Sequence, residues 1–298
     1  YPLVVSATIP PAASVGNNDG NGFQVTVVAT SNANNAVSES VPNRLTTIVA
    51  STVDLTNNLS VAGGATPAQG LGPDDATVKI TNSVTPANAA PTVTRFRLFA
   101  NNTSPLPQVY DLSFNWLAVP GGVGLVSPPI GWTVVFRADG GVGDCSTTVG
   151  PALLTTGAVP VPAGGSRLVC AEVSVPPTGS GAAPVTPTYS PPGNYDIQFG
   201  VSQQNDPAVA DRIRDRVTVL PLHALSITPN GAQTTVPSGV TTYSHVVTNS
   251  GNTGETVTFV PGAYLTNSQV PAFAWSTSAY LDSNANGILD VMTDTLIV

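Results

Sequence analysis

Residues 282–294 carry oxygen-bearing side chains in the spacing of a calcium-binding loop. Aspartate or asparagine stands at loop positions 1, 3, 5 and 9, Gly287 at position 6 permits a sharp turn, and position 7 would offer its backbone carbonyl. Position 12 is Thr293, where such loops usually carry a bidentate glutamate. The alternative is an Asn-Gly hairpin turn that holds no metal. The calcium prediction names Asp282, Asn284, Asn286, Ile288, Asp290 and Asp294.

Cys145 and Cys170 are the only two cysteines of the chain. Two cysteines in a chain of secreted composition predict one disulfide, and the alternative is a pair of buried free thiols. A disulfide that closes a loop of this length is expected to add about 3 kcal/mol to the free energy of unfolding.

Catalytic chemistry is hard to assemble from this sequence. The chain has two histidines, and His245 falls within a strand pattern, where a side chain packed on the strand explains it better than a general base. No Gly-x-Ser-x-Gly nucleophile elbow occurs, and the neighbouring Asp74 and Asp75 lie in a Gly/Pro loop that is typical of a solvated turn. We therefore expect that the protein is not an enzyme.

Tryptophan and arginine residues offer two further candidates for binding. Trp116, Trp132 and Trp275 are predicted to fill cores, and the alternative is an aromatic platform for a sugar. The arginines of the segment 212–216 occupy every second position, so they share one strand face. That face is predicted to meet solvent, and the alternative is a contact with acidic groups of a neighbouring subunit.

The composition limits the fold and the partners of the 298-residue chain. There are 9 Lys and Arg against 17 Asp and Glu, which gives a formal net charge of −8 and makes nucleic acid an unexpected partner. The 28 glycines and 28 prolines exclude a helical bundle. No apolar run is long enough to span a membrane as a helix. Short runs of β-branched and aromatic residues between Gly, Pro and Asn turns predict an all-β sandwich.

Parts of the sequence repeat one another. Residues 22–48 align with residues 193–220, so that Phe23 falls opposite Tyr195, and apolar residues recur at every second position in both segments, as in paired strands. The other matches pair Val93–Thr103 with Val240–Ser250, Tyr110–Phe114 with Glu255–Phe259, Trp132–Cys145 loosely with Thr277–Leu289, and Leu3–Pro11 with Val169–Pro177.

These matches predict three parts: the back half of a repeat at 1–50, a whole repeat at 51–220 and the front half of a repeat at 221–298. Half a sandwich leaves a row of apolar side chains and an unpaired strand edge in water, and both are unfavourable. We therefore expect each half to be completed, either by another copy of the chain or within a longer covalent array.

Three segments carry a resemblance to a known family: VPVPAGGSRLVCAEVSVPP at 159–177, VTNSGNTGETVTF at 247–259 and AYLDSNANGILD at 279–290. They resemble the immunoglobulin-like conserved repeat domain of bacterial cell-surface proteins. The resemblance implies tandem immunoglobulin-like β-sandwich repeats that serve as stalks, fibres or surface-layer components without catalytic activity. It also implies an extracellular or cell-surface location, which agrees with our expectation that a signal peptide has been removed before Tyr1.

Together these features predict a structural subunit of an extracellular bacterial fibre or surface layer. The front half of one copy would close on the back half of the next by strand complementation, so the partners would be further copies, head to tail, and an anchor in the cell envelope. The alternative is an adhesin or carbohydrate-binding stalk module of a long tandem-repeat surface protein. The residues predicted to carry assembly are Leu3, Val5, Ile9, Phe23, Val25, Val27, Tyr243, Val246, Val257, Phe259 and Tyr280.

Overall fold

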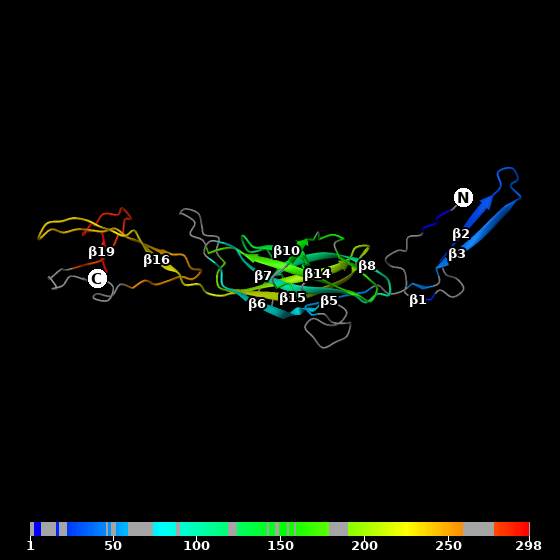
Figure 1. Ribbon diagram of the computed structural model, residues 1–298, viewed down its shortest axis with the longest axis horizontal. Helices are drawn as coiled ribbons and strands as arrows, with labels where there is room; N and C mark the ends of the chain where they lie inside the picture. The colour runs from blue at the N-terminus through cyan, green and yellow to red at the C-terminus, as the bar shows by residue number, and fades with distance from the viewer. Residues whose placement is uncertain are drawn as a thin grey trace. The chain divides into compact units, whose positions relative to one another are not determined.

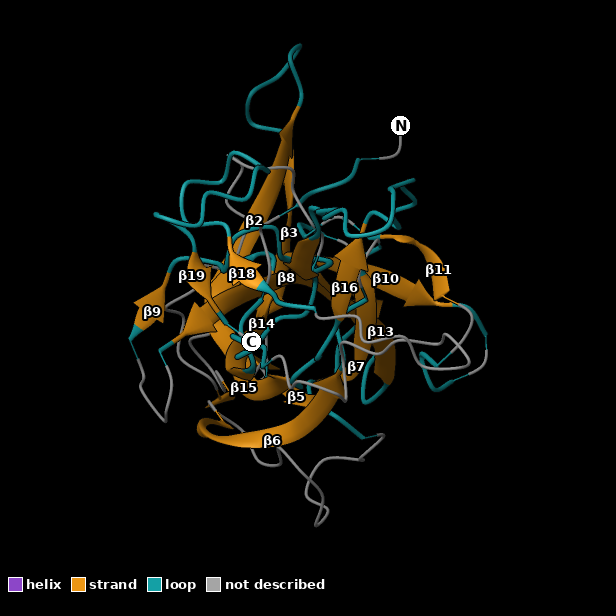
Figure 2. Cartoon of the chain, turned by 90° about the vertical axis from the view of Figure 1, so that its left-hand side faces the viewer, coloured by secondary structure: helices purple, strands orange, loops and turns teal. Residues whose placement is uncertain are grey.

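The computed structural model describes an all-β protein. The described residues are 3–6, 16–17, 23–45, 47–48, 52–58, 74–87, 90–118, 124–141, 143–146, 149–153, 155–157, 159–178, 190–258 and 277–297. They form strands and loops (Figure 2), and none of them belongs to a helix long and apolar enough to cross a membrane. The chain divides into two compact units, residues 1–84, 91–176 and 193–219 in one, and residues 85–90, 177–192 and 220–298 in the other.

The middle of the chain forms two sheets (Figure 1). The first sheet has the order β11-β10-β13-β7-β5, and all its pairings are antiparallel. Its strands are β5 (Val53–Thr56), β7 (Thr92–Asn102), β10 (Thr133–Asp139), β11 (Val149–Ala152) and β13 (Ser166–Val175).

The second sheet has the order β12-β8-β14-β15-β6, and β9 also pairs with β8. Its pairings are antiparallel, except that β15 and β6 run parallel. The strands are β6 (Asp74–Val84), β8 (Gln108–Leu117), β9 (Leu125–Val126), β12 (Val159–Val161), β14 (Gly193–Gln203) and β15 (Asp206–Val219).

This strand order is that of an immunoglobulin-like sandwich. β5, β7, β13 and β10 take the places of strands A, B, E and D in one sheet, and β8, β14 and β15 take those of strands C, F and G in the other. The chain passes from the edge of the first sheet at β5 to the edge of the second at β6. The all-β, immunoglobulin-like fold class predicted from the sequence is therefore confirmed.

Aromatic side chains fill the space between the two sheets. Phe199 of β14 is fully buried, and its ring centroid lies 5.6 Å from that of Phe96 and 6.2 Å from that of Phe136. Trp116 and Trp132 are also buried, with ring centroids 5.3 Å apart. The prediction that these two tryptophans fill the core is confirmed, whereas Trp275 lies outside the described residues.

The remaining strands form two-stranded sheets. In residues 1–50 they are β1 (Gly16–Asn17) with β4 (Thr47–Ile48) and β2 (Phe23–Thr30) with β3 (Ser38–Leu45). In residues 220–298 they are β16 (Leu225–Thr228) with β17 (Val246–Asn249) and β18 (Tyr280–Leu281) with β19 (Thr295–Leu296). The predicted boundaries at residues 50 and 220 stay predictions.

Replacement of Phe199 by alanine should destabilise the sandwich strongly. The substitution leaves a cavity beside Phe96 and Phe136, so we expect a loss of about 3–5 kcal/mol in the free energy of unfolding. Urea titration followed by tryptophan fluorescence measures it, because Trp116 and Trp132 report on the same core. The control is Leu106→Ala at an exposed loop position, for which we expect a change within about 0.5 kcal/mol. Equal midpoints for the two variants would contradict the assigned core.

Candidate assembly surfaces

The hairpin β2–β3 has the same strand register as the hairpin β14–β15 of the sandwich. Phe23 pairs with Leu45 where Tyr195 pairs with Val217, and all eight residue pairs of the first hairpin correspond to consecutive pairs of the second. β2 and β3 are therefore the counterparts of strands F and G, as the sequence alignment of these two segments implies.

A side-chain contact recurs in both hairpins as well. Arg216 Nε donates a hydrogen bond to Asp196 Oδ1 at 2.6 Å, and at the corresponding positions Arg44 Nε donates to Gln24 Oε1 at 3.0 Å. The contact is an ion pair in the sandwich, and in the hairpin β2–β3 the acceptor is neutral. The two hairpins thus share local geometry but differ in charge.

The inner face of the hairpin β2–β3 is exposed where its counterpart in the sandwich is buried. Ile197 is 0% exposed, whereas Val25 at the same position is 41% exposed. Val41 is likewise exposed, and its counterpart Ile213 is fully buried. Among the described residues β2 and β3 pair only with each other, so apolar side chains in the pattern of a core face lie open to solvent here.

The pair β16–β17 repeats the pair β5–β7 in the same manner. Leu225 lies opposite Asn249 where Val53 lies opposite Asn102, and the next three pairs follow in register. β16 and β17 are therefore the counterparts of strands A and B.

The turn that follows the second strand is built alike in both places. The Asn102 side chain donates to the carbonyl oxygen of Leu106 at 2.8 Å, and the Asn249 side chain donates to that of Thr253 at 2.6 Å, four residues on in each case. The side-chain oxygen of each asparagine also accepts the backbone N–H two residues on. This shared turn shows that the equivalence of β7 and β17 extends beyond the strands.

The apolar side chains of the second segment are exposed too. Tyr243 is 44% exposed against 1% for its counterpart Phe96, and Val246 is 60% exposed against 6% for Phe99. In the sandwich, β13 pairs along the whole of β7 and covers this edge. Within the residues that the structure describes, β17 pairs with β16 alone, so the edge that β13 occupies in the sandwich has no strand on it here.

The structure describes most of the predicted assembly residues. Leu3, Val5, Val25, Tyr243, Val246 and Val257 are exposed, while Val27 and Tyr280 are half-buried. Phe23 is the first residue of β2, and Ile9 and Phe259 lie outside the described residues. Their role in assembly stays a prediction.

A disulfide joins Cys145 to Cys170, which confirms the prediction from the two cysteines. It ties the loop after β10 to the middle of β13, with 5.6 Å between the two Cα atoms. Disulfides are typical of proteins that fold in oxidising compartments, so the bond agrees with an extracellular location.

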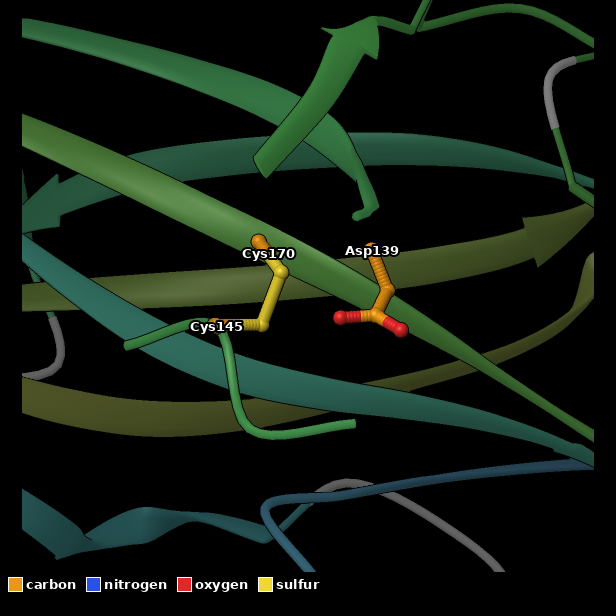
Figure 3. Close-up of side chains that lie close together, drawn as sticks. All are labelled: Asp139, Cys145 and Cys170. Carbon is orange, nitrogen blue, oxygen red and sulfur yellow. A yellow bond between two sulfur atoms is a disulfide. The ribbon is translucent and has the colours of Figure 1, made fainter. Parts of the chain in front are cut away.

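Asp139 lies beside this disulfide (Figure 3). Among the described residues, Asp139, Cys145 and Cys170 are the one group of His, Cys, Asp or Glu residues that gathers closely enough to suggest a metal ion. The sulfur atoms are bonded to each other and so are not thiolate ligands. The Asp139 carboxylate accepts the backbone N–H groups of Gly141 and Gly143 at 3.1 and 3.2 Å, which makes it a turn-forming residue.

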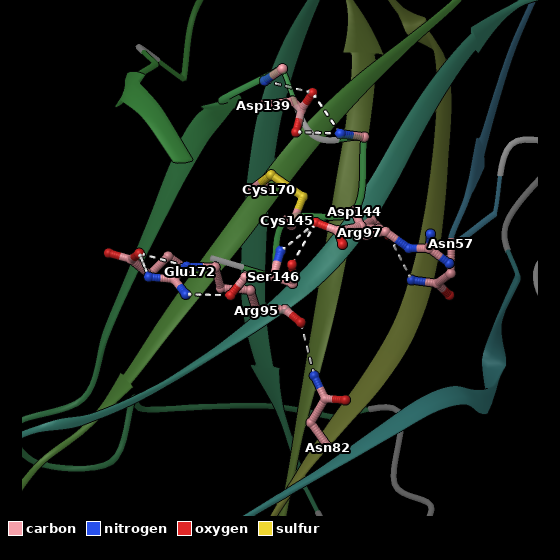
Figure 4. Close-up of a disulfide and its surroundings, with 12 residues drawn as sticks. Asn57, Asn82, Arg95, Arg97, Asp139, Asp144, Cys145, Ser146, Cys170 and Glu172 are labelled. Atoms are coloured by element: carbon pink, nitrogen blue, oxygen red, sulfur yellow. Dashed lines mark hydrogen bonds and ion pairs between the residues drawn. A yellow bond between two sulfur atoms is a disulfide. The ribbon is translucent and has the colours of Figure 1, made fainter. Parts of the chain in front are cut away.

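An ion triad crosses the first sheet next to the disulfide (Figure 4). Glu172 of β13 accepts hydrogen bonds from Arg95 of β7 at 2.9 Å and from Arg137 of β10 at 3.0 Å. Burial acts to raise the pKa of the Glu172 carboxyl, but the hydrogen bonds from Arg137 and Arg95 outweigh it and hold the pKa below its usual value. The triad thus links three neighbouring strands through one ionised carboxylate.

Two buried carboxylates that no sequence pattern singles out connect β15 to β5 and β6. Asp211 accepts the backbone N–H of Leu55 of β5 at 2.7 Å. Asp215 accepts the side chain of Asn57, just after β5, at 2.9 Å and the N–H of Ile80 of β6 at 3.1 Å. Both aspartates are fully buried, and they hold β15 to the segments on either side of the crossing between the sheets.

The prediction that the arginines of β15 face solvent is wrong for Arg214, which is 1% exposed. The guanidinium of Arg214 lies 4.0 Å from Asp196, which also receives both hydrogen bonds of Arg216. Asp196 and Gln198 of β14, which lie on the same face as Arg214, are buried as well. Strand alternation alone does not reveal that this face is buried.

The predicted calcium loop is held by its own hydrogen bonds. Asp282 accepts the N–H of Gly287 at 2.7 Å, and Asp294 accepts the N–H groups of Ser283 and Asp290 at 3.0 and 2.8 Å. Hydrogen bonds from Asn284 and Asn286 lower the pKa of Asp290. The carboxylate oxygens are engaged with the loop itself, and calcium binding stays a prediction.

A cavity of about 340 Å³ opens beside Trp116 and Tyr195 at the end of β8. It bears on the alternative prediction of a sugar-binding platform. Trp116 lines this cavity, but Trp116 and Trp132 are only 5% and 7% exposed, and binding of a sugar stays a prediction. Asp196, at the cavity wall, is engaged by Arg216.

No family model and no curated protein matches the chain, so the resemblance to the conserved repeat domain stays a prediction. Among solved structures, the chain is similar to the N-terminal domain of PorA, at 12% identity over 56% of this chain and 97% of that one, with a TM-score of 0.28. It is also similar to the ASH or PapD-like domain of human CEP192, at 16% identity over 55% of this chain and 97% of that one, with a TM-score of 0.22. TM-scores this low support no conclusion, and the fold class follows from the strand order.

Removal of the disulfide should weaken the sandwich without abolishing it. We expect the double variant Cys145→Ala with Cys170→Ala to lose about 3 kcal/mol in the free energy of unfolding, because its unfolded chain is no longer cross-linked. Urea titration with and without a reductant measures the loss. The reductant should bring the wild type down to the variant and leave the variant unchanged. A wild type whose disulfide is shown to be reduced, with an unchanged midpoint, would refute the expectation.

Asp215 should make stability depend on pH. Burial raises the pKa of its carboxyl to about 7, whereas an unfolded aspartate titrates near pH 3.9. Between these values the folded state keeps a proton that the unfolded state releases, so the free energy of unfolding falls as pH rises from about 4 to 7 and then levels off. Urea titrations across this range should show a smaller decline for Asp215→Asn. Parallel curves for the two proteins would show that Asp215 does not titrate in this window.

Proposed function

We propose that the protein is a structural subunit of an extracellular fibre or surface layer that assembles head to tail. The front half of a sandwich in residues 221–298 of one copy receives the back half in residues 1–50 of the next. The observation that carries the proposal is that both segments keep the strand register of the sandwich, while their inner faces are exposed. The sandwich in the middle of the chain therefore indicates how the strands of the two halves would pair.

The sandwich defines what each half would contribute. The segment 221–298 holds the counterparts of strands A and B and the loop that follows D, and the segment 1–50 holds the counterparts of F and G, with residues 3–11 aligned to E. In the sandwich, E pairs with B and D, and F pairs with C. Joining two halves would therefore add strands to both sheets at once, through main-chain hydrogen bonds and alternating side chains.

Burial of apolar side chains favours this joining. Each valine or leucine that moves from an exposed to a buried position contributes roughly 1.5–3 kcal/mol. Val25, Val41, Tyr243 and Val246 would all gain the cover that their counterparts have in the sandwich. An interface between two different surfaces of the same chain repeats without limit unless its rotation closes a ring, which is the behaviour of a fibre.

The alternative function is a module of a long tandem-repeat surface protein, such as an adhesin stalk. There the same halves would be completed by the neighbouring covalent repeats. The two functions predict different polypeptides. Native fibres that are denatured and reduced should give a mass near 30.2 kDa if copies assemble without covalent continuity. A mass several times larger would overturn assembly from separate subunits in favour of the tandem-repeat protein.

Two substitutions in the hairpin β2–β3 test the assembly face directly. Val25 corresponds to the buried Ile197, whereas Ser40 of β3 corresponds to Arg212, which is exposed in the sandwich. Val25→Asp places a charge in the joint and should abolish fibres, while Ser40→Asp should leave them intact. Val25 and Ser40 are both exposed in the subunit, so neither change should alter its unfolding midpoint. Electron microscopy and sedimentation measure assembly. Equal assembly of the two variants would refute the assigned face.

A further inference from the structure

The joint can be specified residue by residue, given the proposed function. We propose that residues 3–6 of a second copy add as an E strand beside residues 242–245, with Val4 packed against Leu289 where the sandwich has its disulfide. The joint keeps the register of the sandwich but replaces its disulfide and most of its charges with neutral side chains. The occupant of the surface is a second copy, because the matching strand sequence lies in the same chain.

The register follows from β13 and β7. In the sandwich, Cys170 pairs with Arg97, and the pairing continues in register along both strands. The sequence alignment puts Val4 at the position of Cys170 and Ser244 at the position of Arg97. Val4 of one copy would therefore lie opposite Ser244 of the next. Val4 is 91% exposed, whereas Cys170 is 0% exposed.

The loop geometry places Leu289 at the position of Cys145. Gly141 and Gly143 have φ angles of +94° and +78°, and the loop near the C-terminus repeats this pattern with Ala285 at +55° and Gly287 at +74°. Cys145 follows the second of these turn residues by two positions, as Leu289 follows Gly287. Leu289 is exposed. A valine and a leucine would thus make an apolar contact where the sandwich has a covalent bond.

The ion triad of the sandwich has no charged counterpart in the joint. Glu172, Arg95 and Arg137 correspond to Ser6, Thr242 and Leu281. All three replacements are uncharged. The B, E and D strands of the joint would therefore meet without an ion pair.

The buried charges of β14 and β15 are mostly replaced as well. Asp196, Arg214 and Asp215 correspond to Gln24, Pro42 and Asn43. The charges that remain are Glu39 at the position of Asp211 and Arg44 at that of Arg216. Asp211 accepts the N–H of Leu55, whose counterpart is Ile227, so Glu39 has an N–H to accept in the joint.

The difference in charge has a physical reason. An ion pair within one sandwich stays formed as long as the sandwich is folded. The two surfaces of a joint, in contrast, are separate and exposed to water before assembly. Burying a charge whose partner is misplaced costs several kcal/mol, so charged joints tolerate few errors of register or occupancy. Neutral strands lose only main-chain and apolar contacts when they separate. Each half can therefore be exposed to solvent before assembly and still pair with the other half of a second copy.

Cysteine cross-linking of full-length fibres tests the register. The variant Val4→Cys with Leu289→Cys should assemble, and mild oxidation should then give a ladder of covalent multimers on a non-reducing gel that collapses with reductant. The matched control is Val5→Cys with Leu289→Cys, because neighbouring side chains of a strand point to opposite faces, and it should give no ladder. Native Cys145 and Cys170 are already bonded to each other and do not compete.

The possible outcomes distinguish an error in the proposed register from an error in the proposed function. Fibres of the Val4→Cys variant that give no ladder, or equal ladders from both variants, would overturn the register and leave the fibre function standing. Bonding within one chain, seen as a monomer that migrates faster without a ladder, would overturn the second copy as the occupant. Absence of fibres from the unmodified protein would instead refute the proposed function.

Salt tests the neutrality of the joint separately. Ionic strength of 1 M screens charges beyond about 3 Å. A joint held by main-chain and apolar contacts should not weaken between 0.05 M and 1 M sodium chloride, so the critical concentration for assembly should stay the same or fall as salt screens the repulsion between subunits of net charge −8. Fibres that dissolve at 1 M salt would overturn the neutral joint, even if the cross-link forms.

Discussion

Every part of this protein depends on one constraint: in an immunoglobulin-like sandwich, each sheet draws strands from both halves of the sequence. Strand E must pair with strand B and strand F with strand C, so the first four strands alone bury neither sheet face. In the middle of the chain this constraint is met within 170 residues, and the core closes around Phe96, Phe136 and Phe199. Among the described residues of 1–50 and 221–298, the pairs β2–β3 and β16–β17 keep the register of the sandwich, and apolar side chains such as Val25, Val41 and Tyr243 are exposed.

Strand pairing was the part of the fold that the sequence could predict. Alternation of apolar residues is a local property, so the alignment of Phe23 with Tyr195 predicts that the two segments form equivalent strands, and the structure shows that the two hairpins share one register. The disulfide followed from two cysteines, and the core position of Trp116 from its strand. The buried carboxylates Asp211 and Asp215 could not be found this way. Their partners are the N–H of Leu55 in β5, the side chain of Asn57 just after it and the N–H of Ile80 in β6, and contacts between segments so far apart in the sequence leave no periodic signal. Arg214 was misplaced because alternation predicts the face of a side chain and not what covers that face.

The sandwich and the proposed joint have the same strand arrangement but would be stabilised by different interactions. The sandwich combines its apolar core with a disulfide, an ion triad around Glu172 and buried aspartates that fix the first strand. Such groups add specificity when their partners are always present. When a partner is lost, a buried charge is left uncompensated, which is destabilising. The proposed joint would keep the apolar alternation and replace most of these groups. Asn43 at the position of Asp215 illustrates the exchange, because an amide offers an acceptor to the neighbouring strand at any pH, whereas the buried carboxyl of Asp215 becomes charged above its pKa of about 7.

The proposed joint also gives a reason why the exposed faces need not cause indiscriminate association. A bare strand edge can pair with many strands, but a surface that requires E, F and G together accepts only a segment with three strands in the right order and register. In the proposed assembly that segment is residues 1–50, and the surface that would receive it is residues 221–298. Because these two surfaces differ, two copies would satisfy each other symmetrically only if both joints closed at once. Each addition would otherwise leave one surface of each kind open, so the proposed assembly would have a direction along its length.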